Sequence, residues 1–277
     1  TVSQLGFMIM AAGAGHPHAA MMHLAVHAFF KAGLFLGAGA VMYALHHLAQ
    51  TSGIAFNAQS LHNMGGLRRQ LPVTALTFGL CSAALAGVPL FTGFISKDAI
   101  LTGMWHWYDG SAVRLAIVVA AFTVPALTVI YTFRMNWFIF FGDNRTVKNT
   151  GAPVGELKEA PLTMLLPNGV LALCSLWFCV ALNPFHFSGW LHRFLHQHEA
   201  IHAPYITMLS ALMVLVAACI TYWLIHDKEP IRGGISPMLY QIFYLDKIYE
   251  KSIGRSVQWA SVGVQKMDAR MIDKFLH

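Results

Sequence analysis

The sequence predicts an all-α protein, a polytopic transmembrane helix bundle with one discontinuous helix and a C-terminal amphipathic segment. Apolar residues make up 56% of its 277 residues and charged residues only 11%. A soluble domain carries roughly 25% charged residues, so this chain could not cover a surface that faces water. Apolar stretches of about 20 residues, the length that crosses a bilayer as a helix, recur along the chain. One of them is interrupted by proline and glycine.

Six apolar segments are candidate membrane spans. In chain order they are residues 1–14, 18–45, 71–101, 111–141, 161–183 and 204–226. The first is too short to cross a bilayer, and we interpret it as the second half of a span. The spans divide the chain into three regions: 1–142, 143–235 with the spans at about 161–183 and 204–226, and 236–277.

Lysine and arginine in the loops predict the orientation of these spans, because such residues gather on the cytoplasmic side. Three segments are rich in them, with Arg68 and Arg69, with Arg145, Lys148 and Lys158, and with Lys228 and Arg232. The opposite loops hold only Arg114 and Arg193. We therefore expect the C-terminal segment 227–277 on the cytoplasmic or matrix side, and the histidine-rich loop 184–203 on the other.

The last region, residues 236–277, lacks a spanning run but has apolar side chains at helical spacing. These are Ile242, Leu245, Ile248, Tyr249, Ile253 and Val257, with acidic and basic residues between them. The pattern is typical of an amphipathic helix that lies on a membrane surface or on protein. The net charge of +6 over the whole chain favours basic loops that face an anionic cytoplasmic leaflet, and we expect no nucleic acid.

His23, His27 and Lys31 place three ionisable side chains within one apolar span. Their spacing of four residues drifts by only about 40° per step around a helix, so they share a face. A charged side chain at the centre of a membrane helix costs about 2.5–3.5 kcal/mol, and it persists where it faces protein or water on an ion path. Histidine exchanges protons near neutral pH, and a lysine held away from water can also lose its proton. The group predicts a proton relay.

A second group follows the interruption of the third apolar segment. Gly87, Pro89 and Gly93 predict a broken helix at about residues 86–97, followed by Lys97 and Asp98. Irregular backbone at membrane depth is tolerated only beside protein or a water-filled cavity, and broken helices mark ion sites in transporters. Neighbouring residues point about 100° apart on a helix, so these two charges need not pair. We interpret Lys97 as a switchable charge that Asp98 modulates.

Each group also has a simpler interpretation. Three polar side chains on one face can form a contact between helices, and Lys97 and Asp98 at an interface would extend to water. The histidines of loop 184–203 include two with a spacing of four, but we expect no metal there. The four cysteines lack metal-like spacing, and the chain contains no nucleotide or redox-cofactor motif. We expect no cofactor and no redox catalytic residue in this chain.

Several stretches resemble a known family. They are TVSQLGFM at 1–8, HLAVHAFFKAGLFL at 23–36, MGGLR at 64–68, GFISKD at 93–98, YLDKIY at 244–249 and DARMID at 268–273. In these stretches the sequence is similar to the distal antiporter-like, proton-pumping subunit of respiratory complex I (NADH:quinone oxidoreductase). That subunit is related to the large subunit of Mrp-type sodium/proton antiporters.

The resemblance implies roles for particular residues. His23, His27 and Lys31 correspond to the central hydrophilic axis of the family. Lys97 corresponds to the terminal lysine of the second half-channel, with Asp98 beside it. Residues 1–142 are then the antiporter-like core, and 236–277 lead toward a lateral helix. The family's first half-channel has no counterpart, so we expect either an incomplete piece or a second chain that supplies the rest.

The resemblance also implies a function. We expect proton translocation across a bacterial inner membrane or an organelle inner membrane, as a subunit of NADH:quinone oxidoreductase. Flavin and iron–sulfur clusters would then belong to partner subunits. The expected partners are other membrane-arm subunits, including the adjacent antiporter-like subunit, and lipid. A sodium/proton antiporter, a hydrogenase-linked or carbon-uptake relative, and a purely structural membrane subunit stay open as alternatives.

Overall fold

A computed structural model of the chain describes residues 1–142, 145–146, 151, 157–179, 203–226 and 250–267. These residues form helices joined by turns, and the β-structure among them is limited to one isolated bridge between Phe91 and Leu176. The predicted all-α class is therefore confirmed. The chain separates into two compact units, Thr1–His226 and Asp227–His277, and each is described by itself.

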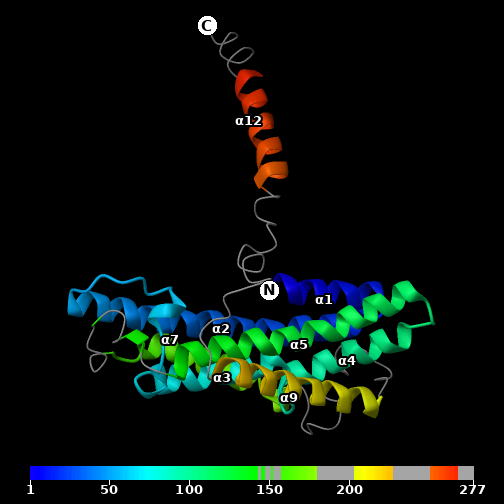
Figure 1. Cartoon of the computed structure of the whole chain (residues 1–277), viewed down its shortest axis with the longest axis horizontal. Coiled ribbons are helices and arrows are strands. Elements are labelled where there is room, and N and C mark those ends of the chain that lie inside the picture. Colours follow the sequence, from blue (N-terminus) through cyan, green and yellow to red (C-terminus); the bar gives the residue numbers. More distant parts are fainter. Residues whose placement is uncertain (143–144, 147–150, 152–156, 180–202, 227–249, 268–277) are drawn as a thin grey trace. The chain divides into compact units, whose positions relative to one another are not determined.

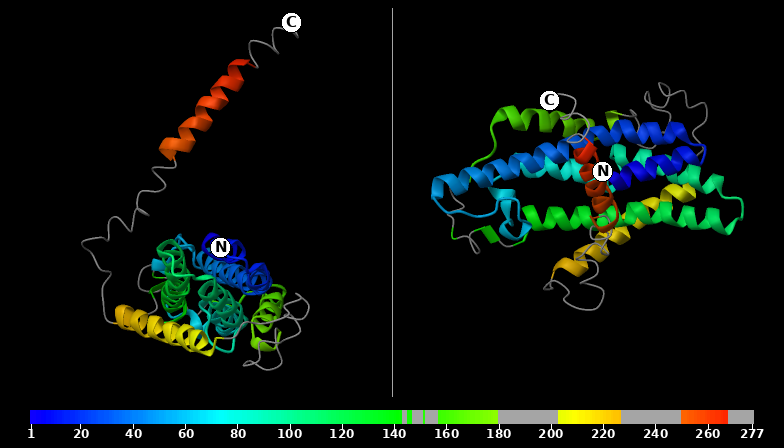
Figure 2. Two further views of the ribbon diagram at one scale, coloured as in Figure 1. Left: turned by 90° about the vertical axis from the view of Figure 1, so that its right-hand side faces the viewer. Right: turned by 90° about the horizontal axis from the view of Figure 1, so that it is seen from above.

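The first unit is a bundle in which most helix axes run roughly parallel, while α9 (Pro204–His226) crosses them at an angle (Figures 1 and 2). In chain order its helices are α1 (Val2–Gly13), α2 (Pro17–Ser52), α3 (Pro72–Ala86), α4 (Thr92–Trp107), α5 (Ala112–Phe140), α7 (Leu162–Cys174) and α9 (Pro204–His226). Short 3₁₀ turns occur at Leu61–Asn63, Leu67–Arg69 and Trp177–Cys179. Helix α2 packs against α1, α3, α4 and α7, while α9 packs mainly against α5. Helix α2 is thus the centre of the bundle.

Three of the described helices are long and apolar enough to cross a membrane. They are Pro17–Ser52, Ala112–Phe140 and the stretch Pro204–Leu224 of α9. Helices α1, α3 and α7 are apolar but shorter. Large apolar side chains cover outward faces, with Ile9 72% exposed and Met208 74% exposed. Such faces suit lipid, whereas several polar side chains point into the bundle.

Helix α2 is longer than the span predicted at 18–45, because signals at both ends define it. Pro17 begins the helix at a position where its missing N–H is not needed. Gly53 ends it with a φ of 69°, in the left-handed conformation that glycine adopts without steric cost.

Helix α7 is shorter than the span predicted at 161–183. It ends at Cys174, and Ser175 turns the chain so that its backbone N–H bonds the carbonyl of Ala172 at 3.1 Å. Leu176 then forms the bridge to Phe91. The apolar composition of the segment indicated a span, whereas a tertiary contact ends the helix. The predicted end of the span lies outside the described residues.

Two glycines allow α2 to approach its neighbours closely. A Cβ added at Gly33 would lie 2.5 Å from the sulfur of Cys81, and one at Gly37 would lie 2.8 Å from the Phe78 ring. Asn168 of α7 packs at the same place and donates to Thr77 Oγ1 at 2.8 Å. Small residues four apart are typical of helix contacts within membranes. This spacing fixes α3 and α7 against α2.

Loops predicted to share one side of the membrane contact each other in the structure. Arg145 Nε donates to the carbonyl of Met64 at 2.9 Å, and Thr146 Oγ1 donates to that of Asn63 at 2.8 Å. The Glu159 carboxylate accepts the backbone N–H of Val73 at 2.7 Å, where an acid stabilises the start of α3. The side of the membrane on which these loops lie stays a prediction.

The second unit contains a π-helical turn, Glu250–Gly254, and helix α12, Arg255–Met267. Helix α12 lies within the segment predicted to be amphipathic, and its apolar side chains Val257, Trp259 and Val264 are exposed. Residues 227–249 and 268–277 lie outside the described residues, and they include the YLDKIY and DARMID stretches.

Candidate functional site

The interruption between α3 and α4 is short and irregular. Helix α3 ends at Ala86, and Gly87 follows with a φ of 80°. A turn then brings the N–H of Phe91 to 3.2 Å from the carbonyl of Val88, with Leu90 at a φ of 74°. Helix α4 begins at Thr92, so the non-helical stretch is shorter than the predicted 86–97, and Lys97 and Asp98 lie inside α4.

The first turn of α4 is held by contacts with α3 and with the end of α7. The backbone N–H and the hydroxyl of Thr92 both donate to the carbonyl of Ser175, at 3.1 and 3.0 Å. Gly93 lies directly against the backbone of Ala84. These contacts fix the rotation of α4 and hence the directions in which its polar side chains point.

Lys97 points back toward the end of α3. Its side chain is 3% exposed, and Nζ donates to the carbonyl of Leu85 at 2.5 Å. This carbonyl is one of the last four of a helix, which have no partner within the helix. These carbonyls also carry partial negative charge that favours a cation. The break therefore provides a neutral acceptor for the ammonium group at a point where a continuous helix would provide none.

Asp98 points toward α9 and away from Lys97. Its oxygens accept hydrogen bonds from Thr207 Oγ1 at 2.8 Å and from Ser210 Oγ at 3.1 Å. Within the described part of the chain, neither Lys97 nor Asp98 forms an ion pair. Both line a small cavity together with Gly87 and Ser210, with room for about one water molecule.

His23 is fully buried and hydrogen bonded at both ring nitrogens. Nδ1 lies 2.7 Å from Ser96 Oγ on α4, and Nε2 lies 3.0 Å from Gln4 Oε1 on α1. The Gln4 amide nitrogen donates in turn to Thr128 Oγ1 on α5 at 3.2 Å. A continuous chain of hydrogen bonds thus joins four helices through His23.

His27 lies one turn further along α2. Its ring centroid is 6.0 Å from that of His23 and 5.3 Å from that of Phe30. The side chain is 5% exposed, yet Nε2 has no hydrogen-bond partner within the described residues. The charge of Lys97 acts on both imidazoles, and the charge of Lys31 acts on His27. Lys97 is therefore electrostatically coupled to both histidines, and Lys31 to His27.

Lys31 differs from the two histidines because it is only half-buried. Its Nζ lies 5.1 Å from the centre of the Phe35 ring, and no hydrogen bond joins it to another described residue. Two steps of about 40° accumulate to about 80° around the helix, which turns Lys31 out of the core that holds His23. The sequence predicts that all three side chains share one face. The two histidines are both buried in the core, whereas Lys31 is only half-buried.

Comparison with known proteins agrees with the sequence motifs. A family model described as "NADH:quinone oxidoreductase/Mrp antiporter, TM" matches residues 1–123. These residues include α1, α2, the break and the whole of α4, and therefore all five predicted pathway residues. Residues 1–123 belong to this antiporter family. The predicted resemblance to an antiporter-like complex I subunit related to Mrp is confirmed.

Relatives with curated names match over most of this chain. NADH-quinone oxidoreductase subunit L of Mycobacterium tuberculosis strain H37Rv is 36% identical over 83% of this chain and 35% of its own length. NAD(P)H-quinone oxidoreductase subunit 5 from the chloroplast of Chara vulgaris is 37% identical over 88% of this chain and 37% of its own. The chain 5 protein of Synechocystis is 29% identical over 99% and 46%. The chain thus spans between about a third and just under half of these relatives.

A solved structure of the Mrp complex from Dietzia sp. DQ12-45-1b has the same fold. The match has a TM-score of 0.51 at 22% identity and covers 98% of this chain and 30% of the other. The antiporter family and this fold identify the chain as a membrane protein, as predicted.

His23 and Asp98 are held by polar side chains that were not among the predicted pathway residues. Gln4 and Ser96 lie within the TVSQLGFM and GFISKD stretches, so their place in family motifs was a usable signal. Thr128, Thr207 and Ser210 lie on α5 and α9, and polar residues of this kind are too common in apolar helices to single out from sequence. Their contacts with Gln4 and Asp98 depend on helix packing.

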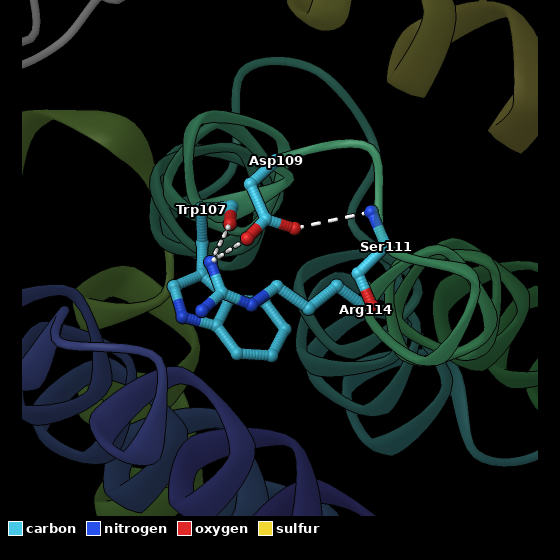
Figure 3. A network of polar contacts seen from close by, with 4 residues as sticks. All are labelled: Trp107, Asp109, Ser111 and Arg114. Carbon is cyan, nitrogen blue, oxygen red and sulfur yellow. Dashed lines mark hydrogen bonds and ion pairs between the residues drawn. The ribbon is translucent and has the colours of Figure 1, made fainter.

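Other candidates lie apart from this network. Within the described residues no group of three or more potential metal ligands comes together, and the histidines of loop 184–203 lie outside them. An ion pair joins Arg114 to Asp109 at 2.9 Å in the turn after α4 (Figure 3). Arg114 also donates to the carbonyl of Trp107 at 3.2 Å. These contacts close the turn at the opposite end of α4 from Lys97.

Proposed function

We propose that the chain translocates protons as the distal, antiporter-like subunit of an NADH:quinone oxidoreductase. The proposed path includes His23, His27 and Lys31 and leads to Lys97 and Asp98. The single observation that supports it most is the environment of Lys97. This side chain is almost fully buried, and its ammonium group bonds the neutral carbonyl of Leu85. Lys97 forms no ion pair within the described part of the chain, so loss of its proton would break none, and its charge can change.

The coupling between the histidines favours a single proton on the pair. Two unit charges 6.0 Å apart, the separation of the two imidazole centres, interact by about 3 kcal/mol at an effective dielectric of ~20. That energy corresponds to about a hundredfold change in a protonation equilibrium. Protonation of both rings together is therefore disfavoured, and a proton that arrives at one ring promotes release from the other.

We propose that partner subunits carry out the chemistry that drives transport. The proposal assigns flavin and iron–sulfur clusters, quinone reduction and the remaining membrane arm to other chains. It also assigns the charge changes that act on Lys97 to those neighbours. This chain then supplies the titratable groups and the buried hydrogen bonds but no electron transfer.

The deciding experiment replaces Lys97 by alanine in the assembled protein and measures protons moved per electron transferred. Lys158→Ala is the matched control, because Lys158 is an exposed lysine in a loop. We expect a lower ratio for Lys97→Ala with assembly intact, and an unchanged ratio for Lys158→Ala. An assembled Lys97→Ala variant that pumps normally would refute the proposal and favour a structural role.

An Mrp-type sodium/proton antiporter is the second candidate, because the matching family model names both groups. It predicts sodium-dependent proton exchange in vesicles without any quinone substrate. A hydrogenase-linked subunit would instead co-purify with different partner chains. Identification of the co-purifying subunits separates these possibilities.

A further inference from the structure

We propose that Ser96 is the relay hydroxyl through which His23 gains and loses its proton. Its role in transport rests on the proposed function, whereas the hydrogen-bond pattern that it requires can be measured independently. Ser96 is fully buried on the first turns of α4, and its Oγ lies 2.7 Å from His23 Nδ1.

A chain of hydrogen bonds through Gln4 and Thr128 determines whether the other nitrogen of His23, Nε2, carries a hydrogen. The Thr128 hydroxyl donates to the carbonyl of Val124 at 2.8 Å, and with its hydrogen used there it accepts from the Gln4 amide nitrogen at 3.2 Å. The Gln4 amide oxygen is thereby directed at His23 Nε2, at 3.0 Å. Because an amide oxygen only accepts hydrogen bonds, Nε2 carries a hydrogen in both the neutral and the charged ring. The proton that comes and goes is therefore the one on Nδ1.

Ser96 can serve Nδ1 in both states, because its hydroxyl has two acceptors within reach. In neutral His23 the hydroxyl donates to Nδ1. In charged His23 the Nδ1–H donates to Oγ, and the hydroxyl hydrogen turns to the carbonyl of Gly93 at 3.3 Å. Rotation of one hydroxyl therefore satisfies either state without movement of the ring.

The transfer itself balances through the hydroxyl. A protonated donor, such as a water molecule or a neighbouring titratable group, gives a proton to Ser96 Oγ while the Oγ–H bond breaks and its hydrogen forms the Nδ1–H bond. The donor loses one positive charge and His23 gains it. Since Nε2 is occupied by Gln4 and Nδ1 by Ser96, the hydroxyl is the entry to the ring within the described residues.

The groups that surround His23 suit this exchange. His27 on α2 and Lys97 on α4 are the titratable groups that act on it. Helices α1 and α5 contribute uncharged Gln4 and Thr128, and the rings of Phe7 and Phe30 cover the remaining faces. The charges of His27 and Lys97 therefore act on the ring whose proton Ser96 exchanges.

The first test is nitrogen NMR of histidine-labelled full chain in membranes, with His23 assigned by its loss in His23→Gln. We expect the neutral ring to carry its hydrogen on Nε2, with a hydrogen-bonded bare Nδ1. In Ser96→Ala the hydrogen bond at Nδ1 should disappear while Nε2–H is retained. A neutral ring with its hydrogen on Nδ1, or an Nδ1 signal unaffected by Ser96→Ala, would overturn the proposal.

The second test is proton transport by the assembled protein. We expect Ser96→Ala to lower the rate about tenfold and to move the pH profile toward acid, because the charged ring loses the stronger hydrogen bond. Ser96→Thr keeps the hydroxyl and should restore the rate. Ser82→Ala is the matched control, since Ser82 is 3% exposed on α3 and its hydroxyl has no partner within the described residues.

The outcomes separate this inference from the proposed function. Normal transport and an unchanged pH profile in Ser96→Ala, beside a defect in Lys97→Ala, overturn the relay and leave the proposed function standing. Normal transport in Lys97→Ala overturns the proposed function, and the NMR result still decides whether Ser96 serves His23.

Discussion

Gly93 lies so close to Ala84 that a side chain at position 93 would overlap the carbonyl oxygen of Ala84. This contact joins the end of α3 to the beginning of α4 across the break. It therefore holds the Leu85 carbonyl at the position where Lys97 reaches it. The contact needs glycine for space, since the residue in the way is rigid backbone.

Gly93→Ala should therefore disrupt the site more than a comparable change elsewhere on α4. The matched control is Gly103→Ala, whose Cβ would meet the ring of His16 at 2.7 Å. His16 is only half-buried and can move, whereas the Ala84 backbone cannot. We expect Gly93→Ala to lower thermal stability more than Gly103→Ala does. We also expect Gly93→Ala to lose assembly or transport. Equal losses in the two variants would contradict this account of the break.

Leu90 is the residue most strained by the break, because it has a φ of 74° without being glycine. Such a conformation costs an L-residue roughly 1–2 kcal/mol. We expect Leu90→Gly to be more stable than Leu90→Ala by about 1 kcal/mol, since both lose the side chain but only glycine relieves the strain. Denaturant unfolding of the two variants in detergent measures the difference. A Leu90→Ala variant at least as stable as Leu90→Gly would show that the turn is relaxed.

The charge on Asp98 is held by hydroxyls of α9, which predicts coupling between Asp98 and Thr207. A hydrogen bond to a charged group contributes about 1.5–3 kcal/mol. Thr207→Val should therefore destabilise the wild type by about that amount and should have a smaller effect in an Asp98→Asn background. A double-mutant cycle on unfolding free energy measures the coupling. Thr221→Val is the control, because among the described residues that hydroxyl bonds the Ala217 carbonyl of its own helix and no group on another helix.

The charged members of the site could be predicted from sequence because charges within apolar spans are rare. Lys97 and Asp98 stood out for this reason, as did the interruption before them. The uncharged members could not, because Thr128 and Thr207 acquire their roles only when α5 and α9 rotate into contact. Helical periodicity placed Lys31 with His27, but the drift over two turns brings it half out of the core. The fold class followed from composition, whereas the end of α7 at Cys174 depends on its contact with the break.

Replacement by phenylalanine should change the free energy of unfolding differently at the two histidines of α2. His23→Phe leaves Gln4 and Ser96 without their partner, and an unsatisfied buried group costs about 1–3 kcal/mol. His27→Phe removes an Nε2 that has no partner within the described residues, so stability should stay level or rise. Both variants should lose proton transport, because neither keeps a titratable ring. Unfolding free energy and transport are measured on the same preparations, and a His27→Phe variant as unstable as His23→Phe would mean that Nε2 is bonded in the membrane.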